Sequence, residues 1–152
     1  MDTAQQTFVM VKPDAVQRGL VGEIVARCER KGLQIIGLKF QLVSPALAAR
    51  HYAEHESKPF FHELVRFITS GPVVALALKG DSAVSVVRGL IGVTDGRKSP
   101  PGTIRGDYGL SQSNNLVHAS DGIESAQREL TLWFPEGVTS WTPVLNSWII
   151  AQ

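Results

Sequence analysis

The chain has 152 residues, of which 43% are hydrophobic and 19% are charged, a length and composition typical of one globular domain with its own core. Its formal net charge of +1 gives no strong field for nucleic acid or for a membrane surface, so neither partner is expected. No apolar run approaches the ~18 residues of a membrane span, and no signal sequence opens the chain, which indicates the cytoplasm. The single cysteine, Cys28, agrees with a reducing compartment and falls on the apolar face of a predicted helix.

Short apolar runs predict the strands. They cover residues 8–11, 36–42 and 73–78, with a brief fourth strand at 116–118. Pro13 cannot continue a central strand, so Lys12 is expected at the C-terminal edge of the first one.

Helices are predicted between these strands by apolar residues three and four positions apart. They cover residues 21–31, 45–52, 60–69, 82–91 and 122–134. Asp81 is the expected cap of the fourth helix, and Asp121 with Glu124 forms the expected capping box of the last. Strands interleaved with helices predict an α+β sandwich in which helices cover one sheet. We expect a single domain over 1–152, with 135–152 as a C-terminal tail.

Periodicity disappears between Gly92 and Asn114, a stretch rich in Gly, Pro, Ser, Asp and Arg. A loop longer than ~15 residues in a compact domain is usually functional or disordered. The rigid composition of residues 100–107 favours function. Residues 92–99 look like a phosphate-binding P-loop, but the second glycine stands one position early and the segment follows a helix, so that interpretation is rejected.

His118 ends the brief fourth strand, just before the helix start at Ser120-Asp121. Free N–H groups at a helix start favour anions, which points to phosphate. Glu129 borders the buried face of that helix, and a buried acid needs a partner such as an imidazole. The carboxylate would fix the tautomer of His118 and leave its other nitrogen free to attack. The alternatives are a structural histidine and a carboxylate that reaches water.

Three cations, Lys12, Arg88 and Arg105, are scattered along the chain. Each alone is typical of a surface charge, but together they could converge on a triphosphate, where Arg gives bidentate contacts and Lys a point charge. Thr94 and Asn115 could add neutral donors. Spacing alone does not decide whether the five meet.

The remaining aromatic and imidazole side chains carry weaker signals. Tyr52 and Phe60 could form an aromatic wall for a base, although residues on helical faces are usually core. His51, His55 and His62 lack the spacing of a metal site, so no metal ligation is expected from them.

In these residues the chain resembles the nucleoside diphosphate kinases, from Thr7 to about Ile150. The signature is Asn115-x-x-His118-Ala119-Ser120-Asp121-Gly122-x-Glu124, and it is specific. Five further segments support it in order, at 11–14, 16–20, 59–61, 70–73 and 101–107.

The resemblance implies a ferredoxin-like βαββαβ sandwich with an antiparallel four-stranded sheet. It implies a ping-pong reaction in which the γ-phosphate of a nucleoside triphosphate such as ATP or GTP moves to His118 and then to a nucleoside diphosphate. Mg²⁺ is the implied cofactor, held mainly by phosphates and water. The tail is similar to that of the longer members, which are typically hexamers, so a homohexamer is expected.

The resemblance also implies a role for each matching residue. His118 is the phosphorylated nucleophile, Glu129 orients it, and Ser120 contacts the glutamate. The phosphates and nucleotide are held by Lys12, Arg88, Thr94, Arg105 and Asn115; Tyr52 lies beside the histidine, Phe60 stacks on the base, and Gln112 stands where an apolar residue often covers the other face of the base.

Two other functions are weighed against this one. A non-catalytic member of the same fold, acting in assembly or in nucleic-acid binding, should lack His118 or several of the cations, and this chain has them all. A histidine phosphocarrier acting on proteins would need no pocket for a base.

Overall fold

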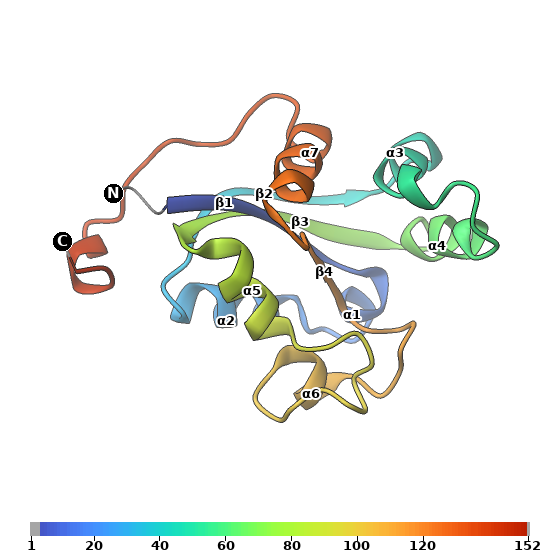
Figure 1. Cartoon of the computed structure of the whole chain (residues 1–152), viewed down its shortest axis with the longest axis horizontal. Helices are drawn as coiled ribbons and strands as arrows, with labels where there is room; N and C mark the ends of the chain where they lie inside the picture. The colour runs from blue at the N-terminus through green and yellow to red at the C-terminus, as the bar shows by residue number, and fades with distance from the viewer. Residues whose placement is uncertain (1–3, 152) are drawn as a thin grey trace.

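Four antiparallel strands form one sheet, in the order β2-β3-β1-β4. The computed structural model describes residues 4–151, and Figure 1 shows the sheet running across the middle of the molecule. The strands are β1 (Ala4–Val11), β2 (Gln34–Leu42), β3 (Pro72–Asp81) and β4 (Val117–Ala119). In the central strand β1, Val11 lies opposite Val74 and Met10 lies opposite His118. The predicted α+β fold with a four-stranded antiparallel sheet is confirmed.

Helices cover both faces of this sheet (Figure 1). They are α1 (Pro13–Gln17), α2 (Val21–Arg30), α3 (Pro45–His51), α4 (Phe61–Ile68), α5 (Ala83–Ile91), α6 (Ile104–Tyr108) and α7 (Ile123–Trp133), with 3-10 turns η1 (Ala53–His55) and η2 (Asn146–Trp148). Among the described residues, no helix has the length and apolar character needed to cross a bilayer.

The second half of β1, residues 8–11, is apolar throughout because both of its faces are buried. Val9 and Val11 pack with α2 and α5 in one core, while Phe8 and Met10 pack with α3, α4 and α7 in the other. All four are 0% exposed. A strand between two helical layers therefore has a continuous apolar run rather than an alternating one. Cys28 belongs to the first core, as predicted.

Two short helices were not predicted. Pro13, which ends β1, is also the first residue of α1, a position where proline needs no hydrogen-bond partner for its nitrogen. Within the long loop, Thr103 caps α6, and its side chain accepts a hydrogen bond from the Gly106 N–H at 2.9 Å. Each helix has only five residues, too few for an apolar periodicity.

Both predicted acidic caps are wrong. Asp81 is the last residue of β3, and the cap position of α5 belongs to Ser82, which makes no capping bond. Instead, the Gln5 side chain accepts from the Val84 N–H at 3.2 Å. The last helix begins at Ile123 after Gly122, so the expected spacing of a capping box is lost, and Asp121 accepts a hydrogen bond from Ser125.

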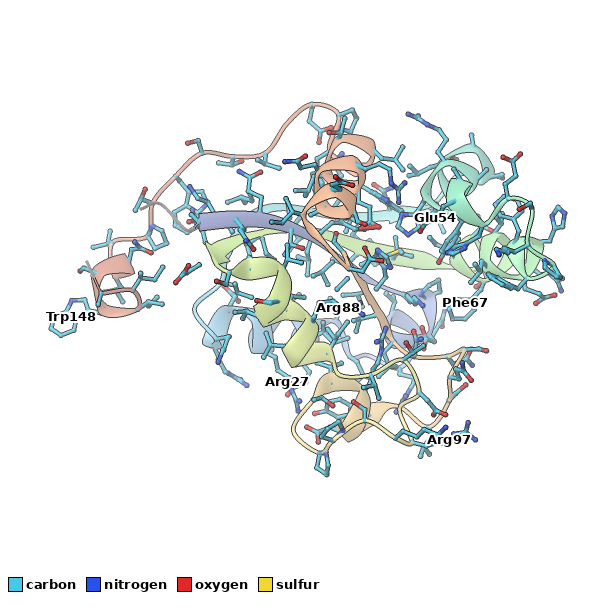
Figure 2. The ribbon with its side chains drawn as sticks, viewed as in Figure 1. Arg27, Glu54, Phe67, Arg88, Arg97 and Trp148 are labelled. Carbon is cyan, nitrogen blue, oxygen red and sulfur yellow. The ribbon has the colours of Figure 1, made fainter. Side chains whose placement is uncertain are left out.

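The tail beyond α7 follows the edge strand β2. The Thr139 N–H donates to the Ile36 carbonyl at 2.8 Å, and the Trp141 indole donates to the Ile35 carbonyl at 2.9 Å. Further on, the chain leaves the sheet, and Trp148 projects from the C-terminal turn with 87% of its surface exposed (Figure 2). The tail therefore is hydrogen-bonded to the edge strand β2 and then exposes the indole ring of Trp148 to solvent.

Gly92 joins α5 to the long loop in a conformation that only glycine adopts easily. Its φ is +85°, and an added Cβ would lie 1.9 Å from the Ser99 hydroxyl oxygen. Gly89, by contrast, lies inside α5 with open space around it.

Gly92→Ala should lower the free energy of unfolding by about 2–3 kcal/mol, because strain and a clash add together. The matched control, Gly89→Ala, should leave it unchanged or raise it by up to about 1 kcal/mol, since alanine favours helix interiors. Urea unfolding followed by circular dichroism measures both. Equal effects of the two substitutions would contradict the geometry at Gly92.

Candidate active site

A cleft of about 320 Å³ lies beside the end of β4 and gathers most of the predicted site residues. The predicted residues that line it are Lys12, Tyr52, Arg88, Thr94, Arg105, Asn115, His118 and Glu129. They come together because β1 and β4 are neighbours in the sheet, with α5, α6 and α7 packed around the same end. Lys12, Arg88 and Arg105 lie far apart in the sequence but line one cavity together with His118. This convergence is what a phosphate-binding site needs.

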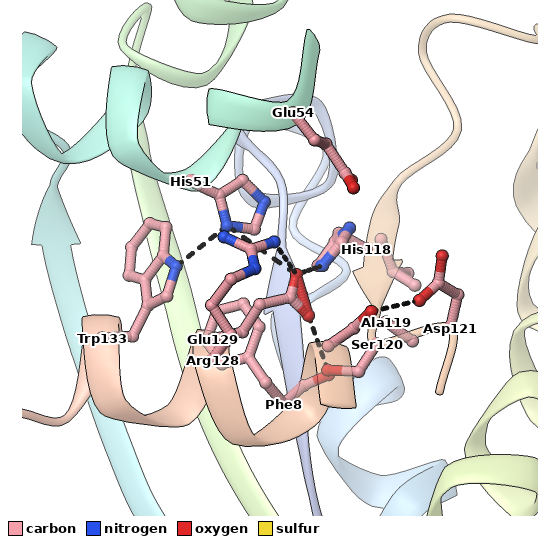
Figure 3. A network of polar contacts seen from close by, with 12 residues as sticks. Phe8, His51, Glu54, His118, Ala119, Ser120, Asp121, Arg128, Glu129 and Trp133 are labelled. Carbon is pink, nitrogen blue, oxygen red and sulfur yellow. Dashed lines mark hydrogen bonds and ion pairs between the residues drawn. The ribbon is translucent and has the colours of Figure 1, made fainter. Parts of the chain in front are cut away.

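His118 and Glu129 form the predicted pair. The imidazole Nε2 lies 2.7 Å from Glu129 Oε2, and the Ser120 hydroxyl donates to the other carboxylate oxygen at 2.6 Å (Figure 3). Glu129 is only 2% exposed. Its burial acts to raise the pKa of the carboxyl, but hydrogen bonds and charge from His118, together with the Ser120 hydrogen bond, outweigh it and hold the pKa below its ordinary value. The acid is therefore ionised and accepts both bonds.

An ionised acceptor at Nε2 fixes the tautomer of His118. Nε2 carries the proton and donates a hydrogen bond to Glu129. Nδ1 is therefore unprotonated and keeps a free lone pair. The side chain is 24% exposed and lines the cleft. Figure 3 shows the second ring nitrogen turned away from Glu129, on the side where the Glu54 carboxylate lies. The geometry presents a nucleophilic nitrogen to whatever occupies the cavity.

Lys12 is a cation with a neutral partner. Its ammonium donates to the Asn115 side-chain oxygen at 2.8 Å, and the Asn115 amide in turn donates to the Gln112 carbonyl at 2.9 Å. Burial lowers the pKa of Lys12 to about 8, and the charge of Arg105 contributes to that lowering. A bound anion would raise the pKa of Lys12 again, because it would stabilise the charged ammonium.

Arg105 is buried, with 5% of its surface exposed. It donates to the carbonyls of Asn115, Gly92 and Val117 at 3.1, 3.2 and 2.7 Å. Burial, together with the nearby charge of Arg88, lowers its pKa to about 10. Three carbonyls therefore hold the guanidinium in place without neutralising it.

Arg88 reaches the same cavity from α5, and its guanidinium donates to the Ala119 carbonyl at 3.4 Å. Within residues 4–151, none of Lys12, Arg88 and Arg105 forms an ion pair with a carboxylate. Asp14 attracts Lys12 and Arg105, and Asp121 interacts with Arg88, but neither carboxylate forms an ion pair with them. The three cations therefore still repel one another, and a polyanionic ligand is the group that would balance them.

Three predicted residues, Phe60, Gln112 and Ser120, do not line this cavity. Phe60 is 47% exposed, and its ring centroid lies 5.5 Å from that of His55, which does line it. Gln112 is exposed and meets the site only through its carbonyl. Ser120 lies behind Glu129, 1% exposed, as its predicted contact requires.

Several cleft residues were missed as site residues. Asp121 belongs to the signature but was interpreted as a helix cap, and Glu54 comes from the irregular turn η1, where no periodic pattern could indicate it. Arg128 precedes the buried Glu129, with its guanidinium 4.0 Å from that carboxylate. His51 falls on the apolar face of the predicted helix at 45–52, which indicates no role in the site.

His51, His118 and Glu129 offer one ligand atom each within 4.8 Å of one another. The lone pair of His51 Nδ1, however, accepts from the Trp133 indole at 3.1 Å, and His118 Nε2 is bonded to Glu129. The three atoms thus belong to a hydrogen-bond network rather than to a ready coordination shell.

Comparison with known proteins identifies the family of the chain. The family model described as nucleoside diphosphate kinase matches residues 5–138. The nucleoside diphosphate kinase of Helianthus annuus is 52% identical over 145 residues, 95% of this chain and 98% of the relative. That of a Cyanothece strain is 55% identical over 146 residues, again 95% and 98%.

Solved structures also match over nearly the whole chain. A halophilic nucleoside diphosphate kinase from Halobacterium salinarum, in complex with CDP, matches with a TM-score of 0.93 and 50% identity, covering 96% of this chain and 98% of that one. A family protein from Babesia bovis matches with a TM-score of 0.93 and 46% identity, covering 96% and 99%. Over nearly its whole length, the chain belongs to the nucleoside diphosphate kinase family.

Proposed function

We propose that this nucleotide phosphotransferase works through a covalent phosphohistidine, in two half-reactions with His118 as acceptor and then donor. The substrates are nucleoside triphosphates such as ATP and GTP, and nucleoside diphosphates. One observation carries the proposal: the free Nδ1 of His118 faces a cavity lined by three cations, while Glu129 holds Nε2. A neutral imidazole with a free ring nitrogen is a nucleophile that can accept a phosphoryl group.

In the first half-reaction the lone pair of Nδ1 attacks the γ-phosphorus. The bond from that phosphorus to the β–γ bridging oxygen breaks, and the nucleoside diphosphate leaves with both electrons. The phosphorylated ring carries a positive charge that the ionised Glu129 stabilises through Nε2–H. In the second half-reaction a terminal oxygen of the acceptor diphosphate attacks, and the N–P bond returns its electrons to Nδ1. Phosphoryl transfer needs positioning and charge stabilisation above all, which the cations on α5, α6 and the end of β1 supply.

Mg²⁺ is the proposed cofactor, and the cleft suits it. This ion prefers oxygen ligands, keeps several waters and is usually bound by one or two carboxylates together with substrate phosphates. Glu54 and Asp121 are the carboxylates of the cleft wall besides Glu129, which is engaged with His118. They would hold the ion through its waters, and Mg²⁺ would neutralise charge on the phosphates.

Steady-state kinetics tests the two-step scheme. With a labelled γ-phosphate on ATP and a different nucleoside diphosphate as acceptor, double-reciprocal plots at several acceptor concentrations should be parallel. Activity should vanish with a chelator in excess of Mg²⁺ and return when the ion is restored. Intersecting plots would contradict a phosphoenzyme and favour direct transfer between two bound nucleotides.

For the base, we propose stacking rather than hydrogen-bonded recognition. The exposed ring of Phe60 next to His55 supports this role, since one aromatic face accepts any base. Gln112 makes no side-chain contact with the cleft, which leaves the opposite face of the base open. Tyr52 is 8% exposed beside His51, and burial raises its pKa to about 12, so its hydroxyl keeps its proton as a donor.

Lys12 should give the reaction an alkaline limit. Its pKa of about 8 means that the ammonium is present below that pH and is lost as the pH rises through it. Because the charged form binds phosphate, kcat/KM for the triphosphate should fall about tenfold per unit above pH 8. Initial rates at subsaturating ATP from pH 6 to 10 measure this.

Two substitutions control that experiment. Lys12→Arg keeps its charge over the whole range and should abolish the alkaline limb, even if the absolute rate falls. Lys31→Arg, on the surface after α2, should leave the limb in place. A rate of the unsubstituted protein that stays flat up to pH 10 would contradict this role of Lys12.

We also propose that the chain assembles as a homohexamer. The edge strand β2 exposes Leu38, Phe40 and Leu42 to 53, 65 and 73%, and Trp148 is exposed on the tail. An apolar edge strand is normally covered in the native assembly. Sedimentation at micromolar concentration should give a single hexamer, and a dimer or tetramer would contradict the proposal.

The cytoplasm is the proposed compartment. Cys28 is 1% exposed, and burial raises the pKa of its thiol to about 11, which keeps it protonated and unreactive. A chain whose single cysteine stays a core thiol suits a reducing environment.

The two other functions find less support. A non-catalytic member would not need an oriented histidine beside three unpaired cations. A phosphocarrier acting on proteins would not need the deep polyanion site around Arg105, and acceptance of nucleoside diphosphates would exclude it as the main role.

A further inference from the structure

A second histidine packs against His118. His51 ends α3, is 2% exposed, and has its ring centroid 4.7 Å from that of His118, at an interplanar angle of 80°. The ring centroid of Phe8 lies 5.8 Å from that of His118. Figure 3 shows His51 beside the pair formed by His118 and Glu129. The packing of His51 and Phe8 restricts rotation of the His118 imidazole.

The protonation of His51 follows from its partner, Trp133. The indole N–H donates to His51 Nδ1 at 3.1 Å, and an indole nitrogen can only donate. Nδ1 is therefore an unprotonated acceptor, and the proton of the neutral ring is on Nε2. Burial and the neighbouring His118 lower the pKa of His51 to about 3, which agrees with a neutral ring. Lys12 and Arg128 add to this lowering, and Glu129 opposes it.

That tautomer matters because His51 Nδ1 lies only 3.9 Å from Glu129 Oε2. A proton on Nδ1 would make His51 a rival donor for the same oxygen that holds His118. With Nδ1 occupied by the indole, both atoms are acceptors and no such bond forms. Glu129 then has two donors, His118 on Oε2 and Ser120 on Oε1.

We propose that His51, fixed by Trp133, is a positioning residue that reserves Glu129 for His118 and keeps Nδ1 of His118 as the single reactive nitrogen. A half-turn of the His118 ring would otherwise place Nδ1 on the carboxylate and Nε2 in the cleft. The inference rests on the proposed function, since it concerns which nitrogen becomes phosphorylated.

The test is which nitrogen of His118 becomes phosphorylated. A merely structural role of His51 would leave that nitrogen unchanged. In the unsubstituted protein, ³¹P and ¹⁵N NMR of the phosphoenzyme should place all phosphate on Nδ1. His51→Leu removes the acceptor and the ring edge, so phosphoenzyme formation should slow by about 10- to 100-fold, with phosphate on both nitrogens. His51→Asn keeps a neutral acceptor for the indole and should restore Nδ1 as the sole site, with a rate within a few-fold.

Trp133→Phe frees the lone pair of His51 Nδ1 without removing the ring. His51 should then become protonated more easily and compete for Glu129, so the acidic limb of phosphoenzyme formation should move to higher pH. Trp141→Phe is the matched control, because it removes an indole hydrogen bond to the Ile35 carbonyl on the tail. Its profile should match that of the unsubstituted protein.

The unsubstituted protein gives an independent reading. Its ¹⁵N shifts should show His51 neutral, with the proton on Nε2, from pH 8 down to pH 5. A proton on Nδ1, or a charged His51 at pH 7, would overturn the inference. So would His51→Leu forming phosphate on Nδ1 alone at the unsubstituted rate. Failure of the proposed function would differ, because the unsubstituted protein itself would then form no phosphohistidine.

Discussion

His118→Gln should abolish phosphotransfer while leaving the fold intact. The glutamine amide can still donate to Glu129, which accepts from His118 at 2.7 Å in the native chain, but it offers no nucleophilic nitrogen. Removal of a covalent nucleophile should lower kcat by about 10,000-fold or more. Coupled assay of nucleoside diphosphate formation measures the rate, and urea unfolding checks that stability is retained.

Two further variants separate chemistry from structure. His118→Ala should lose activity equally but also lose stability, because Glu129 is 2% exposed and would keep only the Ser120 hydrogen bond. His62→Ala, on the exposed side of α4, is the matched control and should retain full activity. If His118→Gln retained more than a trace of transfer, another group would have to be the nucleophile.

Arg105→Met should damage both stability and activity. Its guanidinium is 5% exposed and ties α6 to two other segments, because it donates to the carbonyl of Gly92 and to those of Asn115 and Val117. Loss of these charge-assisted bonds should lower the free energy of unfolding by about 2–4 kcal/mol. Because Arg105 is proposed to face the transferring phosphate, loss of its charge should lower kcat/KM by about 100- to 1,000-fold.

The two effects of Arg105 can be separated. Arg105→Lys keeps a positive charge but cannot reach three carbonyls at once, so it should recover part of the activity while remaining less stable. Arg30→Met, on the exposed end of α2, controls for loss of an arginine and should change neither quantity. Native-like stability of Arg105→Met would contradict its structural role, and native-like kcat/KM would contradict its role at the phosphate.

The sequence predicts the parts of this fold that depend on burial. The apolar run at residues 8–11 of β1 and the Lys12-Pro13 boundary are both visible in the chain, because a stretch buried on both faces favours continuous apolar residues and proline ends a central strand. Glu129 could be paired with His118 for a similar reason, since an acid on a buried helix face needs a partner.

Features set by single local contacts could not be predicted. The five-residue α6 depends on the Thr103 cap, and α7 begins at Ile123 because its cap is Gly122 rather than Asp121. The proposed role of His51 depends on an indole 82 positions away in the chain. Such a contact leaves no periodic pattern, so only the folded structure reveals it.

The most direct test of the covalent mechanism is to mix the protein with γ-labelled ATP and Mg²⁺ in the absence of any acceptor. The label should appear on the protein within one turnover, on the peptide that contains His118, and it should be labile to acid. Addition of a nucleoside diphosphate should then move the label into a new triphosphate. Labelled triphosphate formed only when both nucleotides are present, with no label on His118 at any time, would contradict the mechanism.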